Sequence, residues 1–157
     1  FDIAASRPGR EGVFSNRGLA GIDGAVASAL GLNSVRETPL RVVLGDLTFC
    51  YDLPSLTVRL EQDANVQLIV LDDKGGSIFA SLEHANAPER IYEKYFAVTQ
   101  NIDPVGVARA CGWRSISVES MEDLEAHLRR PVHGLELLHI ALPRPAETLR
   151  ALRDALL

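Results

Sequence analysis

The feature that most limits the fold of this chain is the alternation of short apolar runs with segments of helical pattern. Mostly apolar runs lie at residues 40–44 (LRVVL), 66–71 (VQLIVL) and 135–142, a further strand is expected at 113–118, and helical patterns fill most of the intervals between them. Strands that are apolar almost throughout are typical of parallel sheets with helices on both faces. The sequence therefore predicts an α/β fold, doubly wound, with a mainly parallel sheet covered by helices on both faces.

The expected helices are set by apolar spacing and by their end signals. Asp103 followed by Pro104 is a typical helix start, and Ser120 with Asp123 three positions later is close to a capping box. We expect helices at residues 18–32, 53–62, 104–111, 121–130 and 145–157. A further short strand is expected at residues 13–15, and the stretch from 77 to 103 is expected to be irregular.

The composition excludes several classes of protein. The chain has 157 residues, of which 46% are hydrophobic and 24% charged, so a disordered, collagen-like or disulfide-scaffold protein is excluded. Its formal charge of −5 does not favour binding to nucleic acid. No apolar run approaches the roughly eighteen residues that a membrane span needs. The two cysteines, Cys50 and Cys111, are expected to be free thiols.

Acidic and glycine residues gather directly after two of the expected strands. Gly45 and Asp46 follow the first, and the sequence DDKGG at residues 72–76 follows the second. If these strands are neighbours, Asp46 and Asp73 converge at the edge of the sheet where ligands bind in such folds. Carboxylates repel one another unless a cation lies between them, and Mg²⁺ prefers oxygen ligands that include phosphate. The pattern predicts a site for Mg²⁺ and a phosphoanhydride.

Two other interpretations of this pattern remain open from the residues alone. In the first, Asp46 and Asp72 only cap helices and turns, and Gly75 with Gly76 forms an ordinary loop. In the second, the acidic residues belong to a response-regulator receiver, which also binds Mg²⁺ at strand ends. A receiver has its acidic pair after the first strand, whereas here the single aspartate comes first.

Three stretches narrow the choice: residues 15–24 (SNRGLAGIDG), 45–49 (GDLTF) and 75–79 (GGSIF). In this order and at this spacing they resemble the MenD family, thiamin-diphosphate synthases of menaquinone biosynthesis. The resemblance covers nearly the whole chain, strongly to about residue 82. It implies the thiamin-diphosphate-binding fold, with residues 1–157 as the diphosphate-binding (PP-type) domain of a longer enzyme whose amino-terminal domains are missing. A start at Phe1 rather than at Met agrees with this expectation.

The resemblance also implies an activity. MenD enzymes are transferases that join decarboxylated 2-oxoglutarate to isochorismate with the help of thiamin diphosphate and Mg²⁺ or Mn²⁺. We therefore expect a cytoplasmic homodimer or homotetramer with no nucleic-acid partner and no membrane span. In this family a glutamate from the amino-terminal domain of a neighbouring subunit activates the cofactor, so the chain alone is expected to bind cofactor without turnover. Another thiamin-diphosphate decarboxylase or carboligase, such as a relative of acetohydroxyacid synthase, is the alternative.

Each residue of the site follows from this resemblance. The metal ligands would be Asp46, the side chain of Asp73 and the carbonyl of Gly75. Further contacts to the cofactor would come from Ile22, Leu47, Thr48, Gly76 and Ile78, and contacts to substrate from Arg17, Ile78, Phe79 and Leu82. Ile22, as the prop that bends the cofactor, and Arg17, as the partner of a substrate carboxylate, would form the catalytic set.

Without the resemblance these residues have simpler interpretations. Ile22 would be a core residue of a helix, Arg17 a surface charge, and residues 78–82 a short helix packed into the core. The chain also departs from the family pattern, which commonly has Asn-Asn or Asn-Asp where Asp72-Asp73 stands here. The extra carboxylate attracts Mg²⁺ but repels a diphosphate, so we expect cofactor binding that depends strictly on the metal.

Overall fold

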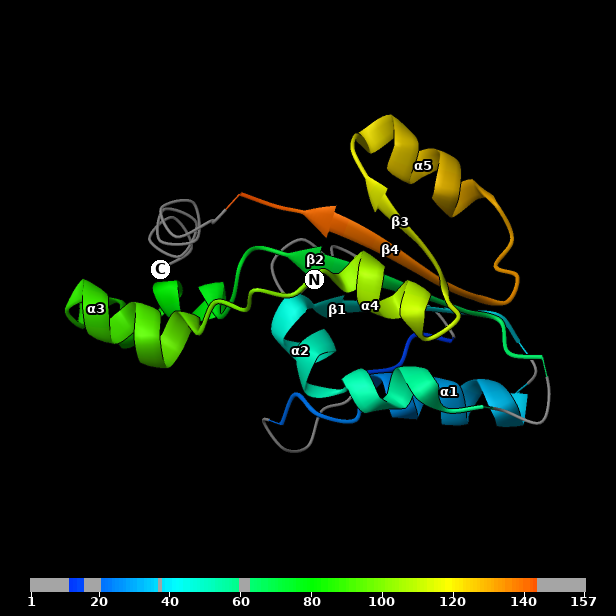
Figure 1. Ribbon diagram of the computed structural model, residues 1–157, viewed down its shortest axis with the longest axis horizontal. Coiled ribbons are helices and arrows are strands. Elements are labelled where there is room, and N and C mark those ends of the chain that lie inside the picture. The colour runs from blue at the N-terminus through cyan, green and yellow to red at the C-terminus, as the bar shows by residue number, and fades with distance from the viewer. Residues whose placement is uncertain (1–11, 16–20, 37, 60–62, 144–157) are drawn as a thin grey trace.

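The computed structural model describes residues 12–15, 21–36, 38–59 and 63–143 (Figure 1). Its strands are β1 (Leu40–Gly45), β2 (Val66–Asp72), β3 (Arg114–Val118) and β4 (Leu135–Ala141). Its α-helices are α1 (Ala25–Arg36), α2 (Asp46–Tyr51), α3 (Glu89–Tyr92), α4 (Pro104–Ala110) and α5 (Met121–Arg129). Short 3₁₀ helices are η1 (Leu53–Thr57), η2 (Ser77–Ser81) and η3 (Glu83–Asn86), and η4 (Glu93–Ala97) is a π-helical turn.

The strands form one parallel sheet in the order β1-β2-β4-β3. Helices α1, α2 and α4 lie on one side of this sheet and α5 lies on the other (Figure 1). The predicted α/β class, with a parallel sheet and helices on both faces, is confirmed. Because β1 and β2 are neighbours, the residues that follow these two strands meet at one edge of the sheet.

The main core fills the space between the sheet and the layer of α1, α2, η1 and α4. Phe49 from α2, Leu30 from α1 and Leu68 from β2 are among its fully buried side chains. Trp113 is also buried, and its indole N–H donates a hydrogen bond of 3.0 Å to the carbonyl of Leu56 in η1. Each large apolar side chain buried in this way contributes roughly 1.5–3 kcal/mol, so this layer is the main source of stability.

A row of polar side chains crosses the opposite face of the sheet. Arg41, Gln67, Glu136 and Arg114 are register partners in four successive strands. Arg41 donates to Gln67 Oε1 at 2.9 Å, and Gln67 donates to Glu136 Oε2 at 2.6 Å. Arg114 completes the row with an ion pair of 2.7 Å to Glu136. A one-residue shift of β2 or β4 would leave buried polar groups without partners, so the row fixes the register.

Helix α1 begins later than the sequence pattern indicates. The helix predicted over residues 18–32 starts at Ala25, and the described residues just before it are not helical. The carboxylate of Asp52 accepts hydrogen bonds from the backbone N–H groups of Val26 (2.6 Å) and Ala27 (2.9 Å). These are N–H groups that a helix leaves without internal partners, so a distant residue determines where α1 begins.

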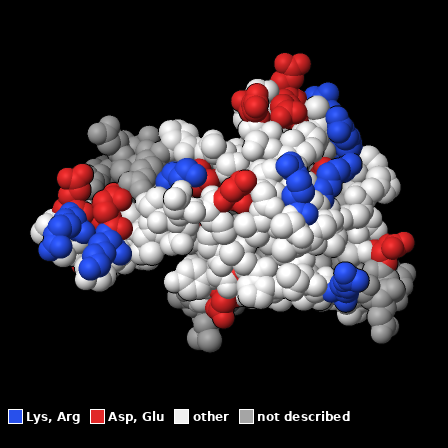
Figure 2. Space-filling model, viewed as in Figure 1, with Lys and Arg blue, Asp and Glu red and all other residues white. Residues whose placement is uncertain are grey.

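Both predicted N-caps are confirmed. The Asp103 side chain accepts from the N–H of Val105 at 3.1 Å with Pro104 in the first turn, and the Ser120 hydroxyl accepts from the N–H of Asp123 at 3.1 Å. Acidic side chains gather over the start of α5 and basic ones toward its end (Figure 2). This distribution of charge is the one that the helix dipole favours.

Two predicted elements are wrong. Residues 13–15 are not a strand, because none of the described strands pairs with them. Within the described residues, the helix predicted over 53–62 is only the short η1, which ends at Thr57 and is followed by Val58 in extended conformation. The carbonyl of Leu56, which a continuing α-helix would use, is instead bound by the Trp113 indole. The helix expected at residues 145–157 lies outside the described residues.

Between β2 and α4 the chain leaves the sheet in an excursion of residues 77–97, at the left of Figure 1. This stretch was expected to be irregular, but it contains η2, η3, α3 and η4. Its two ends meet where the N–H of Gly76 donates to the carbonyl of Ala97 at 2.6 Å. Inside the excursion, aromatic rings with centroids 4.7–6.3 Å apart pack together, namely Phe79, His84, Tyr92 and Phe96.

Cys50 and Cys111 are both half-buried free thiols, as the sequence predicts. Within the part of the chain that the structure describes, no helix has the length and apolar character needed to cross a membrane.

Candidate functional site

Asp46 lies where β1 passes into α2, at the carboxyl edge of the sheet. The residue is 5% exposed, and each of its carboxylate oxygens accepts a backbone hydrogen bond. Oδ1 accepts from the N–H of Leu47 at 2.8 Å, and Oδ2 accepts from the N–H of Gly75 at 2.7 Å. The second bond joins the ends of β1 and β2, so the structure brings together the two motifs that the sequence analysis selected.

The turn that follows β2 has an unusual backbone. Lys74 and Gly75 have positive φ angles of 65° and 120°. A Cβ atom at Gly75 or at Gly76 would collide with backbone oxygens of η4, so only glycine fits at these two positions. The hydroxyl of Thr99 donates to the carbonyl of Lys74 at 3.0 Å. The turn is therefore held between α2 on one side and the end of the excursion on the other.

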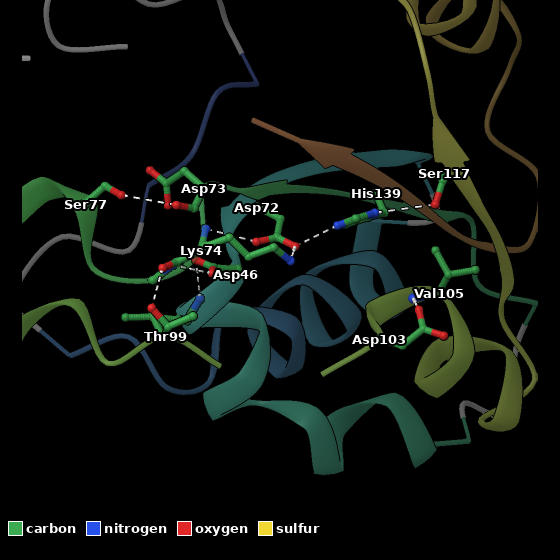
Figure 3. A network of polar contacts seen from close by, with 12 residues as sticks. Asp46, Asp72, Asp73, Lys74, Ser77, Thr99, Asp103, Val105, Ser117 and His139 are labelled. Atoms are coloured by element: carbon green, nitrogen blue, oxygen red, sulfur yellow. Dashed lines mark hydrogen bonds and ion pairs between the residues drawn. The ribbon is translucent and has the colours of Figure 1, made fainter. Parts of the chain in front are cut away.

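Asp72, the last residue of β2, is the centre of a polar chain (Figure 3). Its Oδ1 accepts from the N–H of Lys74 at 3.1 Å, and its Oδ2 contacts the Lys74 ammonium at 2.7 Å. Oδ2 also lies 2.9 Å from Nε2 of His139 in β4, whose Nδ1 is 3.5 Å from the hydroxyl of Ser117 in β3. These contacts link the carboxyl ends of three strands, β2, β4 and β3.

The contacts of Asp72 with His139, and of His139 with Ser117, were not predicted from the sequence. His139 is, with Glu136, one of two polar residues in β4, and its side chain faces the same side of the sheet as Asp72. That signal was present in the sequence. Its meaning depends on the strand order, because β4 lies beside β2 although β3 comes between them in the chain.

The neighbouring carboxylates differ in their electrostatics. Burial raises the pKa of Asp46, and the nearby Asp72 and Asp73 raise it further, although the N–H groups of Leu47 and Gly75 act in the opposite direction. Burial would also raise the pKa of Asp72, but hydrogen bonds from Lys74 and His139 outweigh it and lower this pKa. Asp72 is therefore a stabilised anion, whereas Asp46 would ionise more readily with a cation beside it.

The remaining predicted site residues lie around this centre. Leu47 and Thr48 are half-buried in the first turn of α2, and the N–H of Leu47 is already bonded to Asp46. Asp73 is half-buried in the turn, and Gly76 is buried. Ile22 is 38% exposed and precedes α1, so the interpretation of Ile22 as a buried helix residue is wrong.

The predicted substrate contacts at residues 78–82 are partly open to solvent. Ile78 is 66% exposed and Leu82 is 45% exposed, whereas Phe79 is half-buried and packs against Phe96 with centroids 6.0 Å apart. The interpretation of residues 78–82 as a helix buried in the core therefore fails for Ile78 and Leu82. Arg17, the predicted partner of a substrate carboxylate, lies outside the described residues.

Comparison with known families adds an independent observation. The family described as "Thiamine pyrophosphate enzyme, C-terminal TPP binding domain" matches residues 3–140 of the chain. The chain belongs to this family. Both the Gly45-Asp46 motif and the turn after β2 lie within the matched residues of this thiamine pyrophosphate domain.

Curated relatives of the thiamine pyrophosphate domain carry the name 2-succinyl-5-enolpyruvyl-6-hydroxy-3-cyclohexene-1-carboxylate synthase. The one from Renibacterium salmoninarum is 39% identical over 96% of this chain and 28% of its own length. The one from a Nocardioides species is 33% identical over 98% of this chain and 29% of its own length. These are MenD synthases, so the resemblance found in the sequence is confirmed. The chain spans less than a third of the length of these relatives.

Solved structures agree on the fold. Benzoylformate decarboxylase from Polynucleobacter necessarius matches with a TM-score of 0.58 and 26% identity, over 76% of this chain and 23% of the decarboxylase. A putative thiamin diphosphate-dependent enzyme from Mycobacterium smegmatis matches with a TM-score of 0.55 and 23% identity, over 75% of this chain and 22% of that enzyme. The predicted thiamin-diphosphate-binding fold is confirmed.

Proposed function

We propose that the thiamine pyrophosphate domain holds Mg²⁺ or Mn²⁺ with Asp46, the side chain of Asp73 and the carbonyl oxygen of Gly75, and binds the cofactor diphosphate through that cation. The observation that carries the proposal is the 2.7 Å hydrogen bond from Gly75 to Asp46, which joins the two motifs at adjoining strand ends. In parallel α/β sheets this edge is where ligands bind.

The donor chemistry of the residues fits such a cation. Asp46 and Asp73 offer carboxylate oxygens and Gly75 a carbonyl oxygen, which are ligands that Mg²⁺ and Mn²⁺ prefer. Burial is the main cause of the raised pKa of Asp46, and the repulsion from Asp72 and Asp73 that adds to it would be relieved by a divalent cation. Among the described residues, no group of three His, Cys, Asp or Glu side chains could hold a metal. Backbone and phosphate oxygens would have to complete the shell, as is usual for Mg²⁺.

Other residues of the chain would bind and orient the cofactor and substrate. Thiamin diphosphate, when bound, supplies the capacity to accept the electron pair left by decarboxylation of a 2-oxoacid. Leu47, Thr48 and Gly76 would contact the diphosphate end. Ile22 and Ile78 are both exposed, which leaves their side chains accessible to the cofactor, and a branched aliphatic side chain is stiff enough to act as a prop. The substrate-binding set would be Arg17, Ile78, Phe79 and Leu82.

The proposal for the whole enzyme rests on its relatives. Residues 1–157 would form the diphosphate-binding (PP-type) domain of a MenD-type transferase that joins decarboxylated 2-oxoglutarate to isochorismate in menaquinone biosynthesis. Amino-terminal domains of the same enzyme would complete the site, in a cytoplasmic homodimer or homotetramer. The synthases at 39% and 33% identity over nearly all of this chain support this activity.

Two measurements on the complete enzyme test the proposal. Calorimetric titration should detect thiamin diphosphate binding with Mg²⁺ present and none after chelation with EDTA; equal binding in both conditions would refute the metal site. Product analysis should then detect the joined product from 2-oxoglutarate and isochorismate. The likeness to benzoylformate decarboxylase favours, as a second candidate, a different thiamin-diphosphate decarboxylase or carboligase. In that case cofactor would bind but this product would not form.

The 157-residue chain alone should bind without turnover. The family resemblance implies that the glutamate that activates the cofactor comes from an amino-terminal domain of a neighbouring subunit. We therefore expect no product from the isolated chain under conditions in which the complete enzyme is active. Turnover by the isolated chain would contradict this expectation.

A further inference from the structure

We propose that His139 is a positioning residue for the turn that presents Asp73 and Gly75, and that it acts through the carboxylate of Asp72. The inference rests on the proposed function of this turn as a metal site. His139 lies in β4, outside both strand-end motifs, and the family resemblance assigns no role to it. Figure 3 shows its ring between Asp72 and Ser117, directed along the carboxyl edge of the sheet.

The other contacts of Asp72 show which group donates in its hydrogen bond with His139. Oδ2 of Asp72 already contacts the Lys74 ammonium at 2.7 Å, and Oδ1 accepts from the Lys74 N–H at 3.1 Å. Both partners are donors only, so the carboxylate acts as an acceptor. Nε2 of His139, 2.9 Å from Oδ2, must therefore carry a proton. In the neutral ring Nδ1 is then the acceptor, which matches its position 3.5 Å from the Ser117 hydroxyl.

The position of Asp72 determines the path of the turn. The bond from the Lys74 N–H to Asp72 Oδ1 spans Asp73, so it closes a small ring around the proposed ligand. Lys74 has a φ of 65°, which is unfavourable for a residue with a side chain and needs contacts that hold it. Asp72 supplies two of them, one to the backbone and one to the ammonium of Lys74.

His139 in turn fixes Asp72. The Asp72 side chain is 3% exposed and that of His139 is 14% exposed, so water does not readily replace the bond between them. Without the histidine N–H, the partner that Oδ2 keeps among the described residues is the Lys74 ammonium, on a side chain that is 50% exposed. The carboxylate could then follow the lysine away from the sheet, and Asp73 would lose its position. Residues that orient metal ligands in this way commonly affect metal affinity about 10–100-fold.

The test compares substitutions that keep or remove this donor. In His139→Gln the side-chain amide occupies the place of Nε2 and can still donate to Asp72. In His139→Leu the volume is similar and the donor is lost. Binding of Mn²⁺ by the complete enzyme, with thiamin diphosphate present, is measured by the electron paramagnetic resonance of free Mn²⁺. We expect the Leu variant to lose affinity roughly 10-fold or more, and the Gln variant to stay within about threefold of the wild type.

A second measurement reports on the turn without metal. Hydrogen–deuterium exchange of the peptide over residues 72–76 should be faster in His139→Leu than in the wild type or in His139→Gln. The matched control is His127→Leu, which removes another buried histidine near an aspartate, with Nε2 of His127 3.5 Å from Asp123 in α5. This control should leave Mn²⁺ affinity unchanged. If His139→Leu does not fold, His139→Asn replaces it, because its shorter amide does not reach Asp72.

The outcomes separate this proposal from the one on which it rests. If the wild type binds no Mn²⁺ with thiamin diphosphate, the proposed metal site is refuted and the positioning role with it. If the wild type binds but His139→Leu binds equally well, only the positioning role is refuted. The same follows if His139→Gln is as weak as His139→Leu, or if the His127 control loses as much affinity.

Discussion

A hydrogen bond of 2.7 Å joins the backbone N–H of Gly75 to the buried carboxylate of Asp46, although 29 positions separate the two residues. It ties the turn after β2 to the start of α2, and it places Gly75 beside a carboxylate at one sheet edge. Both ends of this bond are needed for the proposed metal site, so substitutions at either end make the sharpest tests.

Replacing Gly75 with alanine should destabilise the domain. The left-handed φ of 120° costs a side chain about 1–3 kcal/mol, and the added Cβ would collide with the carbonyl of Ala97. Thermal unfolding and Mn²⁺ binding of the complete enzyme should both show a loss. The matched control is Gly31→Ala in α1, where a Cβ has open space and helix propensity should add about 0.5–1 kcal/mol. Equal stability of the two variants would contradict our account of the turn.

The two carboxylates proposed as ligands should respond differently to substitution. Asp46→Ala removes a ligand and leaves the N–H groups of Leu47 and Gly75 without their partner, so thiamin diphosphate binding should be abolished. Asp73→Asn keeps an oxygen donor and reduces repulsion of the diphosphate, so binding should persist. Calorimetric titration of both variants with Mg²⁺ present measures the difference. Binding by Asp46→Ala, or its loss in Asp73→Asn, would disprove these assignments.

The thiol of Cys50 should titrate at high pH. Burial raises its pKa, and the nearby Asp46 and Asp72 raise it further because a thiolate would be repelled. A raised pKa means that the thiol stays protonated, and unreactive, until the pH passes the ordinary range of a cysteine. The rate of alkylation by iodoacetamide, followed at Cys50 by peptide mass spectrometry as a function of pH, should rise only above that range. A midpoint at or below the ordinary value would be inconsistent with the site described.

Asp52 should matter more for stability than an ordinary helix cap. Its buried carboxylate accepts from two N–H groups at the start of α1 and from the hydroxyl of Ser55 at 2.5 Å. Asp52→Ala would leave these donors unpaired, at a cost of roughly 2–3 kcal/mol in the free energy of unfolding. The comparison is Asp103→Ala, which removes an exposed N-cap of α4 and should cost about 1 kcal/mol. Urea unfolding measures both values, and an equal or smaller loss at Asp52 would contradict this ranking.

Features that depend on interactions between residues close together in the sequence could be predicted, whereas features that depend on distant residues could not. The four strands and helices α4 and α5 were predictable because their signals are local: apolar runs, Asp103 with Pro104, and Ser120. The glycine and aspartate motifs also indicated which sheet edge carries the site, because parallel strands end at the same edge. These signals do not depend on residues far away in the chain.

The predictions that were wrong or missing concern features of the structure that are determined by residues far away in the sequence. The start of α1 depends on Asp52, and the early end of η1 depends on Trp113, so neither can be read from the local pattern. The link between His139 and Asp72 requires knowing that β4 lies beside β2. The short helices of the excursion likewise form in a segment whose ends are brought together by a contact that its own sequence does not indicate.

That contact, between Gly76 and Ala97, has a consequence for how such a domain can change during evolution or by design. Because the hydrogen bond between Gly76 and Ala97 joins the two ends of the excursion, the residues between them form a closed segment. The proposed metal ligands lie outside this segment, whereas Phe79 and Leu82, which are proposed to contact substrate, lie inside it. We therefore expect exchanges within this segment to alter substrate preference, provided that the hydrogen bond between Gly76 and Ala97 and the tight packing of Phe96 against the turn are kept.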